Sequence, residues 1–410
     1  MESKRVLFTW EIGQGFGHVM PLLPIARELK ERGHRVTFAL RDVRAAGALL
    51  KAEGFTVLQA PTHPDQFFPA NGPQPQTMAD ILTIFGFASN NHLKGLIAAW
   101  EGLISVCCPD VVVASYAPLS LLCARKATIP TVLMALPFEL PSQTHPSPNI
   151  RTGKTPENRV ADERVISAVN QAIGGNAIST VHDIFRADKT FLMSYPELDM
   201  LNPREQVEYC GSFFISDVGI SPQWPIQAGK RVFAYLHADL PSLDSLRLAI
   251  QSSPYSYSIV LRGADTSLVS KWQAPNVCVS AKLVRLDHSL PACDAVLTYG
   301  GNGFASACLM AGKPMVFFVR DLESYLTARQ VARLGAGILP QPQSASTVMA
   351  ALEHVLQTPI YTTSASNFAQ SKLSETGLNP TKVVAEAVIK AMLERAVGAD
   401  RKLTHWGCGQ

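Results

Sequence analysis

The sequence lacks the features that would assign it at once to several classes of protein. Its eight cysteines form no Cys-x-x-Cys pair, so no structural zinc site is expected. Its 36 basic and 33 acidic side chains leave a net charge of only +3. That balance argues against a nucleic-acid partner, although the pI of about 8.4 would tolerate an acidic ligand.

Signals for export and for membrane insertion are also missing. The first residues contain no apolar stretch before a small-residue cleavage site, so no signal peptide is expected. The longest mostly apolar run, residues 111–124, is too short to span a bilayer and contains Ser, Tyr and Pro. We therefore expect no transmembrane segment and a location in the reducing cytoplasm.

What the sequence has is enough apolar material for a large core. About 47% of its 410 residues are hydrophobic and 17% are charged, which excludes wholesale disorder and suggests two or three domains. Short β-branched runs alternate with longer segments of helical periodicity. This alternation predicts an α/β protein with parallel sheets and right-handed crossovers.

The first half contains six predicted strands and five predicted helical regions. The strands are expected at 6–10, 35–40, 55–58, 110–114, 130–135 and 190–195, and the helices at 18–33, 43–53, 77–106, 117–127 and 160–186. Residues 60–76 and the proline-rich segment 137–158 are expected to form loops.

The alternation restarts after an irregular, proline-rich segment. Strands are expected at 231–237, 257–262, 277–281, 295–299 and 314–319, with helices between them and at 324–334. The predicted domains are an N-terminal domain at 1–200, a linker at 201–230, a C-terminal domain at 231–375, a last helix at 376–397 and a flexible tail at 398–410.

Two glycine loops follow predicted strands, where open parallel sheets bind their ligands. The first, GQGFGH at Gly13 to His18, differs from the GxGxxG pyrophosphate fingerprint because its last position is His. The acidic residue expected about 20 residues later is not cleanly present. A dinucleotide cofactor is therefore the poorer interpretation of this loop.

The second loop, YGGNG, leads into an apolar helical segment. Glycines let a phosphate approach the backbone, and a helix N-terminus offers unpaired N–H groups and positive dipole charge. This loop could hold a diphosphate without a metal. A tight strand-to-helix turn with no ligand explains the same residues about as well.

These motifs together resemble the GT-B glycosyltransferases of the macrolide and UDP-glycosyltransferase type, a bacterial, nucleotide-sugar-dependent group. The resemblance covers nearly the whole chain. The segments that carry it are GQGFGHVMPLLPIARELKERGHRVTFA, PDVVVASYAPLSLLCARKATIP, LPACDAVLTYGGNGFASACLMAGKPMVFF and LTARQVARLGAG. The fold it implies has two doubly wound Rossmann-like domains that face each other across a cleft, with the acceptor mainly on the first and the nucleotide sugar mainly on the second. The last helix would cross back to the N-terminal domain.

The resemblance also implies roles for particular residues. His18 matches the family's catalytic base, and its ordinary pKa near 6.5 suits proton removal near neutral pH. The Asp that orients this His in relatives is replaced by Ser115. Ser115 could hold the ring by a neutral hydrogen bond, an acidic group elsewhere could replace the missing Asp, or the acceptor could ionise more readily than an alcohol.

Several implied substrate-binding positions depart from the family pattern. Tyr299 replaces the phosphate-binding His, Phe304 a small hydroxyl residue, and Ala307 the ribose-binding Glu. Glu323 and Ser324 match the sugar-binding pair, in which Ser324 shortens a Gln. The complete set of expected substrate contacts is Gly15, Gly17, His237, Val284, Tyr299, Gly300, Gly301, Asn302, Gly303, Glu323 and Ser324.

The leading hypothesis is an inverting, metal-independent glycosyltransferase that uses a UDP- or dTDP-sugar as co-substrate and needs no further cofactor. Its acceptor would be a small apolar-aromatic or lipid-like molecule held by residues 60–100 and 137–175, which contain Phe67, Phe68, Phe85, Phe87, Trp100 and Phe138. The alternative is a catalytically degenerate nucleotide-binding or regulatory protein. A nucleotide-sugar epimerase is less favoured, because no carboxylates cluster after the strands. The oligomeric state is not visible in the sequence.

Overall fold

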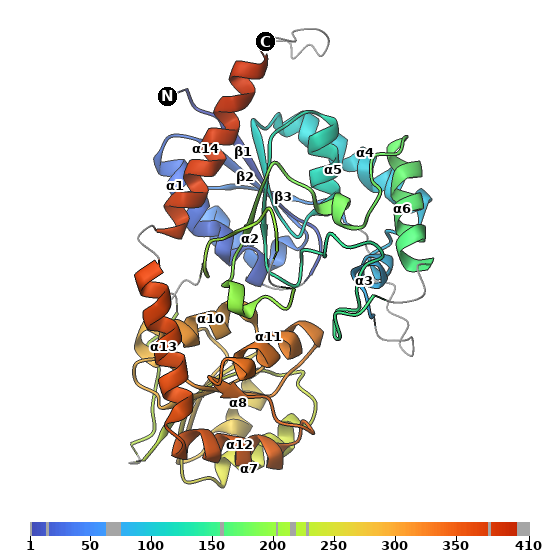
Figure 1. The fold of residues 1–410 in the computed structure, drawn as a ribbon. Helices are drawn as coiled ribbons and strands as arrows, with labels where there is room; N and C mark the ends of the chain where they lie inside the picture. Colours follow the sequence, from blue (N-terminus) through green and yellow to red (C-terminus); the bar gives the residue numbers. More distant parts are fainter. Residues whose placement is uncertain are drawn as a thin grey trace. The chain divides into compact units, whose positions relative to one another are not determined.

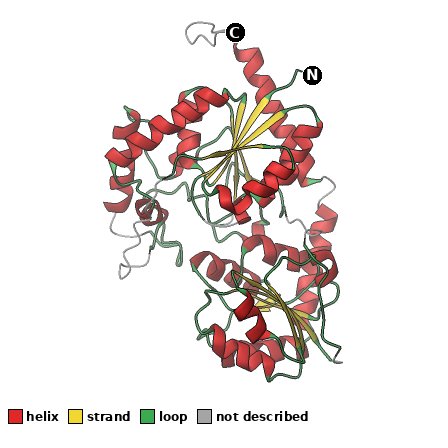
Figure 2. Ribbon diagram, turned by 180° about the vertical axis from the view of Figure 1, so that it is seen from behind, coloured by secondary structure: helices red, strands yellow, loops and turns green. Residues whose placement is uncertain are grey.

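The computed structural model describes residues 2–13, 16–62, 75–155, 160–201, 204–213, 219–226, 229–375 and 379–399. The chain forms two compact units. The first comprises Met1–Met193, Pro203–Phe213 and Asn379–Gln410, and the second Ser194–Asn202 and Phe214–Leu378. Each unit has one parallel sheet with helices on both of its faces (Figures 1 and 2). The predicted class, two doubly wound α/β domains, is confirmed.

The sheet of the first unit is entirely parallel and has the order β3-β2-β1-β4-β5-β6-β7. The order reverses between β1 and β4, which lie side by side and create a topological switch point. The strands are β1 Arg5–Trp10, β2 Arg35–Leu40, β3 Thr56–Gln59, β4 Val111–Ser115, β5 Thr131–Ala135, β6 Lys189–Leu192 and β7 Glu208–Tyr209.

The helices of the first unit include one from the far end of the chain, α14, which packs against α1 (Figure 1). Arg32 at the end of α1 forms an ion pair with Glu386 of α14 at 2.5 Å. The α-helices are α1 Leu23–Glu31, α2 Val43–Ala52, α3 Met78–Ile84, α4 Asn90–Cys107, α5 Pro118–Lys126, α6 Val160–Ile173 and α14 Pro380–Ala399, with the 3-10 turns η1 Phe16–His18, η2 Met20–Leu22 and η3 His182–Phe185.

Three predicted helices of this unit are shorter or divided. The helix expected at 18–33 begins only at Leu23, after two 3-10 turns, because Pro21 and Pro24 have no amide hydrogen to donate. The region 77–106 is two helices, α3 and α4, and the region 160–186 is α6 followed by η3. The two-residue strand β7 was not predicted, because it is too short to show a periodic pattern.

The sheet of the second unit repeats the same plan with the order β10-β9-β8-β11-β12-β13, again entirely parallel. Its switch point lies between β8 and β11. The strands are β8 Arg231–His237, β9 Ser256–Arg262, β10 Val277–Ser280, β11 Ala295–Thr298, β12 Met315–Phe317 and β13 Gly337–Ile338. The helices are α7 Leu243–Gln251, α8 Thr266–Trp272, α9 Leu286–Ser289, α10 Asn302–Met310, α11 Leu322–Arg333, α12 Ala345–Gln357 and α13 Ile360–Glu375, with the 3-10 turn η4 Pro196–Leu198.

Both faces of the second sheet are covered by apolar side chains. Phe233, Val296 and Phe317 belong to the core cluster that includes residues of α10 and α11. Their neighbours along the same strands, such as Val232 and Leu297, belong to the cluster formed with α7 and α12. Burial on both faces explains why these strands are continuously apolar in sequence.

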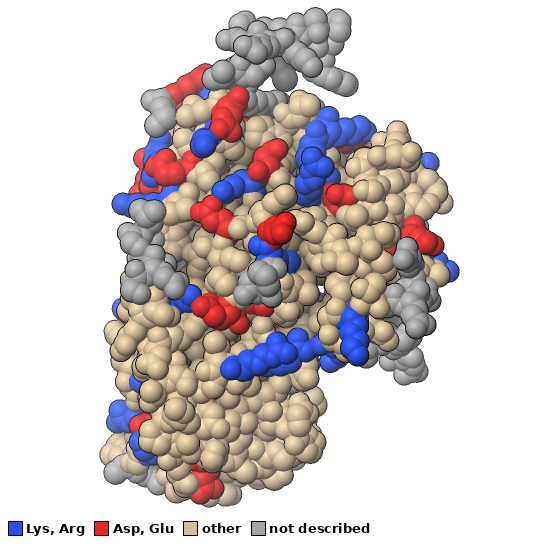
Figure 3. Space-filling view, viewed as in Figure 1, with Lys and Arg blue, Asp and Glu red and all other residues tan. Residues whose placement is uncertain are grey.

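The surface charges of the first unit are mixed in sign on the face drawn in Figure 3, where Lys and Arg side chains are interspersed with Asp and Glu side chains. Within the described part of the chain, no helix is both long and apolar enough to cross a membrane.

Two glycine substitutions test this packing with opposite expected signs. A Cβ at Gly337 in β13 would collide with the carbonyl oxygen of Met315 in β12, so Gly337→Ala is expected to destabilise the protein by about 1–3 kcal/mol. A Cβ at Gly95 in the exposed interior of α4 would meet no atom within 4 Å, so Gly95→Ala is expected to stabilise it by about 0.5–1 kcal/mol. Urea denaturation of both variants measures the two shifts. Equal shifts would contradict the close approach of β12 and β13.

Candidate active site

The predicted base, His18, lies in a buried aromatic setting at the carboxyl end of β1. Its ring stacks on Trp10, the last residue of β1, with centroids 5.4 Å apart and an interplanar angle of 20°. The ring of Tyr116, just after β4, lies tilted to it at 6.0 Å. The switch point between β1 and β4 therefore positions this histidine, whose side chain is 10% exposed.

A carboxylate lies against the imidazole. The Nδ1 atom of His18 is 2.9 Å from Oε1 of Glu139, whose side chain is only 2% exposed. The second oxygen of Glu139 accepts a hydrogen bond from the Leu136 amide at 2.9 Å, so the carboxylate is anchored in the turn that follows β5. Although these two atoms are close, they do not form a hydrogen bond with each other, so the contact is one of charge proximity. The other ring nitrogen, Nε2, is the ring atom nearest to Gly13.

Glu139 supplies the acidic group that the sequence pattern lacked at position 115. Sequence reasoning left open an acidic group elsewhere but did not find this residue, because it lies in a proline-rich loop without a motif. The available signal was its place four residues after β5, at the same sheet edge as His18.

Ser115, the residue expected to hold the ring, does not do so in the structure. It ends β4, is fully buried and pairs in register with Trp10 of β1. Within the described residues its hydroxyl oxygen has no hydrogen-bond partner. The contact with the His18 ring is made by Glu139 instead.

The glycines of the first loop differ in what the fold demands of them. Gly13 has a φ of +90°, and a Cβ there would collide with the His18 ring, so both the backbone and the ring require glycine. Gly17 lies in η1, and a Cβ there would meet no atom within 4 Å. The predicted substrate contact Gly15 lies outside the described residues.

A second buried carboxyl group, missed by sequence reasoning, joins the segment after β1 to the start of α5. Both oxygens of Glu11, just after β1, accept hydrogen bonds from the first turn of α5: 3.0 Å from the Leu119 amide and 2.5 Å from the Ser120 amide. Burial raises the pKa of Glu11 to about 8 despite these bonds. An acidic residue directly after a buried strand was the available sequence signal.

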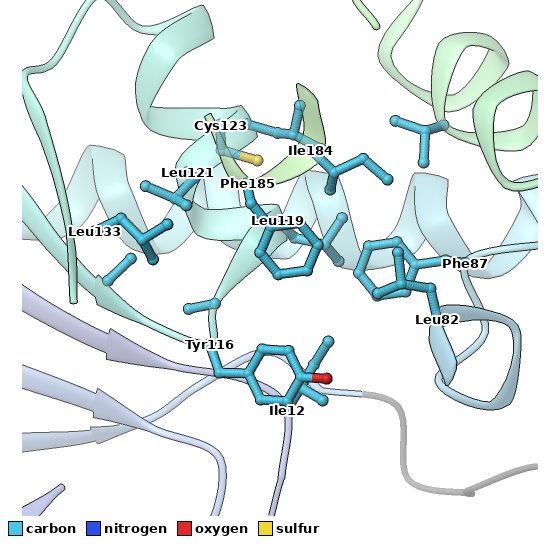
Figure 4. Packing of buried hydrophobic residues seen from close by; sticks show 14 of the residues in the cluster. Ile12, Leu82, Phe87, Tyr116, Leu119, Leu121, Cys123, Leu133, Ile184 and Phe185 are labelled. Atoms are coloured by element: carbon cyan, nitrogen blue, oxygen red, sulfur yellow. The ribbon is translucent and has the colours of Figure 1, made fainter. Parts of the chain in front are cut away.

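The aromatic residues expected to line an acceptor pocket are divided between core and margin. Phe87 and Trp100 are buried in the apolar cluster beside Tyr116, and Phe85 and Phe138 pack at its margin. Figure 4 shows the Tyr116 ring beside Ile12 at the edge of this cluster, below Phe185. The expected residues Phe67 and Phe68 lie outside the described part of the chain.

The carboxyl edge of the second sheet brings His237 and Tyr299 together at the switch point between β8 and β11. Their rings meet edge to face at 6.5 Å, and Nδ1 of His237 is 2.6 Å from Oδ1 of Asp239. A Cβ at Gly301 would lie 3.6 Å from the Tyr299 hydroxyl oxygen, so that hydroxyl is adjacent to the glycine loop. Burial raises the pKa of Tyr299 above its ordinary value, which keeps its hydroxyl a donor at neutral pH.

The glycine loop passes into α10 earlier than predicted. Gly301 is the N-cap residue and makes no side-chain cap, while Asn302 and Gly303 already belong to the first helical turn. Gly300 has a φ of +100°, and a Cβ there would lie 2.9 Å from the Ser324 carbonyl oxygen. Asn302 is buried, and among the described residues its Oδ1 has no hydrogen-bond partner. A helix N-terminus that follows a glycine loop is a common place for an anion to bind.

Aromatic stacking fills the space below this loop. Phe304 stacks on Tyr235 at 4.7 Å and lies tilted to Phe233 at 6.1 Å. Tyr235 in turn stacks on Tyr299 at 5.7 Å. Phe304, which replaces the family's small hydroxyl residue, is therefore part of the core.

The predicted sugar contacts Glu323 and Ser324 have different surroundings. Ser324 is buried and forms a capping box with Asp321, accepting from the Arg320 and Asp321 amides and donating to the Asp321 carbonyl. Its hydroxyl cannot bind a sugar without giving up the cap of α11. Glu323 lies half-buried in the first turn of α11, and its charge contributes to the raised pKa of Tyr299.

Val284 and Arg320 complete this edge. Ile220 forms an isolated parallel bridge with Val284 that uses the Leu283 carbonyl and the Arg285 amide, so the backbone groups of Val284 itself take no part in it. The guanidinium of Arg320, a residue sequence reasoning missed, lies 6.0 Å from the Tyr299 ring centroid and 3.4 Å from an Asp321 oxygen. Within the described ranges, no three His, Cys, Asp or Glu residues form a group suited to a metal ion.

Two doubly wound parallel sheets with polar side chains at their switch points define the GT-B class of fold. The chain superposes on the calicheamicin glycosyltransferase CalG4 with a TM-score of 0.70 at 18% identity, over 96% of this chain and 99% of that one. For the glycosyltransferase VinC in complex with dTDP the TM-score is 0.67 at 17% identity, over 95% of this chain and 100% of that one. The fold expected from the resemblance to GT-B glycosyltransferases is thus confirmed.

In sequence, the chain matches known proteins over part of its length. Residues 259–390 match the family model of the erythromycin biosynthesis protein CIII-like C-terminal domain. A stretch of 133 residues is 29% identical to the erythronolide mycarosyltransferase of Saccharopolyspora erythraea. That stretch covers 32% of this chain and 31% of the relative, so the match spans about a third of the curated relative's length.

The buried carboxyl group of Glu11 predicts a pH-dependent stability. The unfolded side chain loses its proton near pH 4.5, whereas the folded one holds it to about pH 8. Unfolding therefore releases a proton between these values, and stability falls as pH rises through this window, by about 1.4 kcal/mol per pH unit from this group alone. Urea denaturation from pH 5 to 8 should give a flatter curve for Glu11→Gln than for the wild type. The exposed control Glu163→Gln should keep the wild-type slope, and parallel curves for Glu11→Gln would contradict the argument.

Proposed function

We propose that this protein is an inverting, metal-independent glycosyltransferase that moves a sugar from a UDP- or dTDP-sugar to a hydroxyl group of a small-molecule acceptor. The observation that carries the proposal is the 2.9 Å contact between His18 and Glu139. A buried imidazole oriented by a carboxylate can accept a proton from a hydroxyl group and can bear the positive charge that results.

The reaction would proceed in a single displacement. The acceptor hydroxyl loses its proton to Nε2 of His18, and its oxygen attacks the anomeric carbon of the donor. The bond from that carbon to the diphosphate oxygen breaks, and the diphosphate leaves with the electron pair. One displacement from the opposite side inverts the anomeric centre. Glu139 stabilises the imidazolium until the proton is released to solvent.

The edge of the second sheet would receive the leaving diphosphate. The N-terminus of α10 would face the diphosphate with its positive dipole end, and the neutral Tyr299 hydroxyl would be a hydrogen-bond donor. The His237 ring and the Arg320 guanidinium lie beside Tyr299 and would be further contacts to the diphosphate. Val284 is proposed to contact the base of the nucleotide, and Glu323 the sugar.

The relatives support the choice of substrates. VinC was solved with dTDP, which favours a thymidine nucleotide as the donor of this chain too. The names of the erythronolide mycarosyltransferase and the calicheamicin glycosyltransferase favour a hydroxylated natural product of comparable kind as the acceptor.

A degenerate nucleotide-binding protein is the second candidate function. It is favoured by Phe304, which fills the place of a small hydroxyl residue with a stacked ring, and by Ala307 in place of an acidic residue. Such a protein would bind the nucleotide without transferring a sugar.

Variants of the proposed base and its partner test catalysis. We expect His18→Ala to abolish transfer and Glu139→Gln to lower kcat about 10- to 100-fold. Loss of the carboxylate makes the protonated ring less stable, so the acidic limb of the Glu139→Gln rate profile should move to lower pH. Rates are measured from pH 5 to 9 with dTDP- and UDP-sugars and a macrolide acceptor panel.

Ser115→Ala is the matched control, because its hydroxyl is buried at the same sheet edge but has no partner among the described residues. It should keep at least about half of the wild-type rate, since the substitution removes a buried hydroxyl group without breaking a hydrogen bond. A severe loss in Ser115→Ala together with near-normal turnover in Glu139→Gln would return the orienting role to Ser115.

Donor binding is tested separately by thermal shift and calorimetry. At 100 times its Kd, dTDP or UDP should stabilise the folded protein by about 2.7 kcal/mol, and NAD should not. Gly303→Asp would place a negative charge at the start of α10 and should abolish this shift. Ala345→Asp in the first turn of α12 is the control and should retain it. Binding of NAD in place of dTDP and UDP would reject the nucleotide-sugar assignment.

A further inference from the structure

A cavity of about 360 Å³ opens at the amino ends of β1, β2 and β3. Its volume falls within the range of about 300–1,000 Å³ that is usual for small-molecule sites. It lies at the opposite edge of the first sheet from His18, which follows the carboxyl end of β1. The lining residues that matter here are Arg5, Lys30, His34, Arg35, Val36 and Phe55.

The cavity wall is basic. Arg5, Lys30 and Arg35 line it, and no Asp or Glu is among the described lining residues. The Lys30 ammonium donates to a backbone carbonyl, that of Glu53, at 2.5 Å. Arg5 has a carboxylate oxygen only at 3.9 Å, from Asp110, and the exposed Arg35 side chain has no hydrogen-bond or ion-pair partner among the described residues. The positive charge on this wall is therefore only partly compensated.

A buried donor without a partner lies in the same wall. Nδ1 of His34 accepts a hydrogen bond from the Lys4 amide at 3.3 Å. Burial lowers the pKa of this ring, so it is neutral at pH 7 and its proton resides on Nε2. Within the described residues Nε2 has no hydrogen-bond partner, although His34 is only 5% exposed. Nε2 itself has almost no accessible surface, so the His34 ring serves as a reporter of what binds in the cavity and not as a donor to it.

We propose that this cavity is a binding site for a small organic anion with a carboxylate or phosphate group and a short apolar body. The anionic oxygens would lie near the Arg35 and Arg5 guanidinium groups, beside the His34 ring. The apolar part would pack on the side chains of Val36 and Phe55. The proposal is independent of the glycosyltransferase function, because the site uses none of the residues assigned to that reaction.

Three probes test the site on the full chain. Hexanoate and 1-hexanol have the same carbon chain and differ in charge, and inorganic phosphate is an anion without an apolar part. We expect hexanoate to bind in calorimetry and to move the Nε2–H resonance of His34 in ¹⁵N-histidine NMR spectra, assigned with His34→Gln. 1-Hexanol should do neither. If phosphate moves this resonance more than hexanoate does, the ligand belongs to the phosphate class. If hexanoate moves it more, the ligand belongs to the carboxylate class.

Two variants and one control locate the binding. Arg35→Gln should weaken hexanoate binding at least about tenfold, since it removes a charged hydrogen-bond donor. Thr56→Trp, at an exposed lining position, should fill the cavity and abolish binding without changing its charge. Arg44→Gln, which removes the same charge from an exposed residue of α2 outside the cavity, should leave binding unchanged.

The proposal is overturned if neither anion moves the His34 resonance. It is equally overturned if hexanol binds as tightly as hexanoate, or if Arg44→Gln weakens binding as much as Arg35→Gln. None of these results bears on sugar transfer, which is measured separately through His18 and Glu139.

Discussion

The contact between His18 and Glu139 is the interaction on which the chemistry of the first unit depends. An imidazole between a tryptophan and a tyrosine would otherwise be a packed aromatic residue like its neighbours. The carboxylate gives the ring a defined orientation, and its own second oxygen is fixed by the backbone of its turn. Two loops that are distant in sequence, after β1 and after β5, thus meet at one histidine ring, where the proposed reaction would take up its proton.

The second unit has the same kind of sheet topology, but a helix N-terminus takes the place of the histidine at its switch point. Its switch point carries the N-terminus of α10, where the N-cap residue Gly301 has no side chain that could cap the helix. The neighbouring helix α11 is capped by Asp321 and Ser324.

The sequence predicted most of the strands and both loops because continuous apolar strands and glycines at strand ends are local patterns. It also placed His18, since this residue directly follows its glycine turn. It could not locate Glu139 or Arg320, which reach their partners through tertiary structure from segments without a motif. It also did not reveal the capping role of Ser324, because a capping hydroxyl and a ligand-binding hydroxyl look alike in sequence.

The packing of α14 on α1 affects the order in which the protein is made and folded. The second unit lies between two parts of the first in the chain, so a ribosome completes it before it synthesises α14. The first unit cannot bury the outer face of α1 until that last helix emerges. During translation α1 therefore lacks its partner α14 until synthesis is nearly finished, whereas the second unit is complete earlier and can fold first.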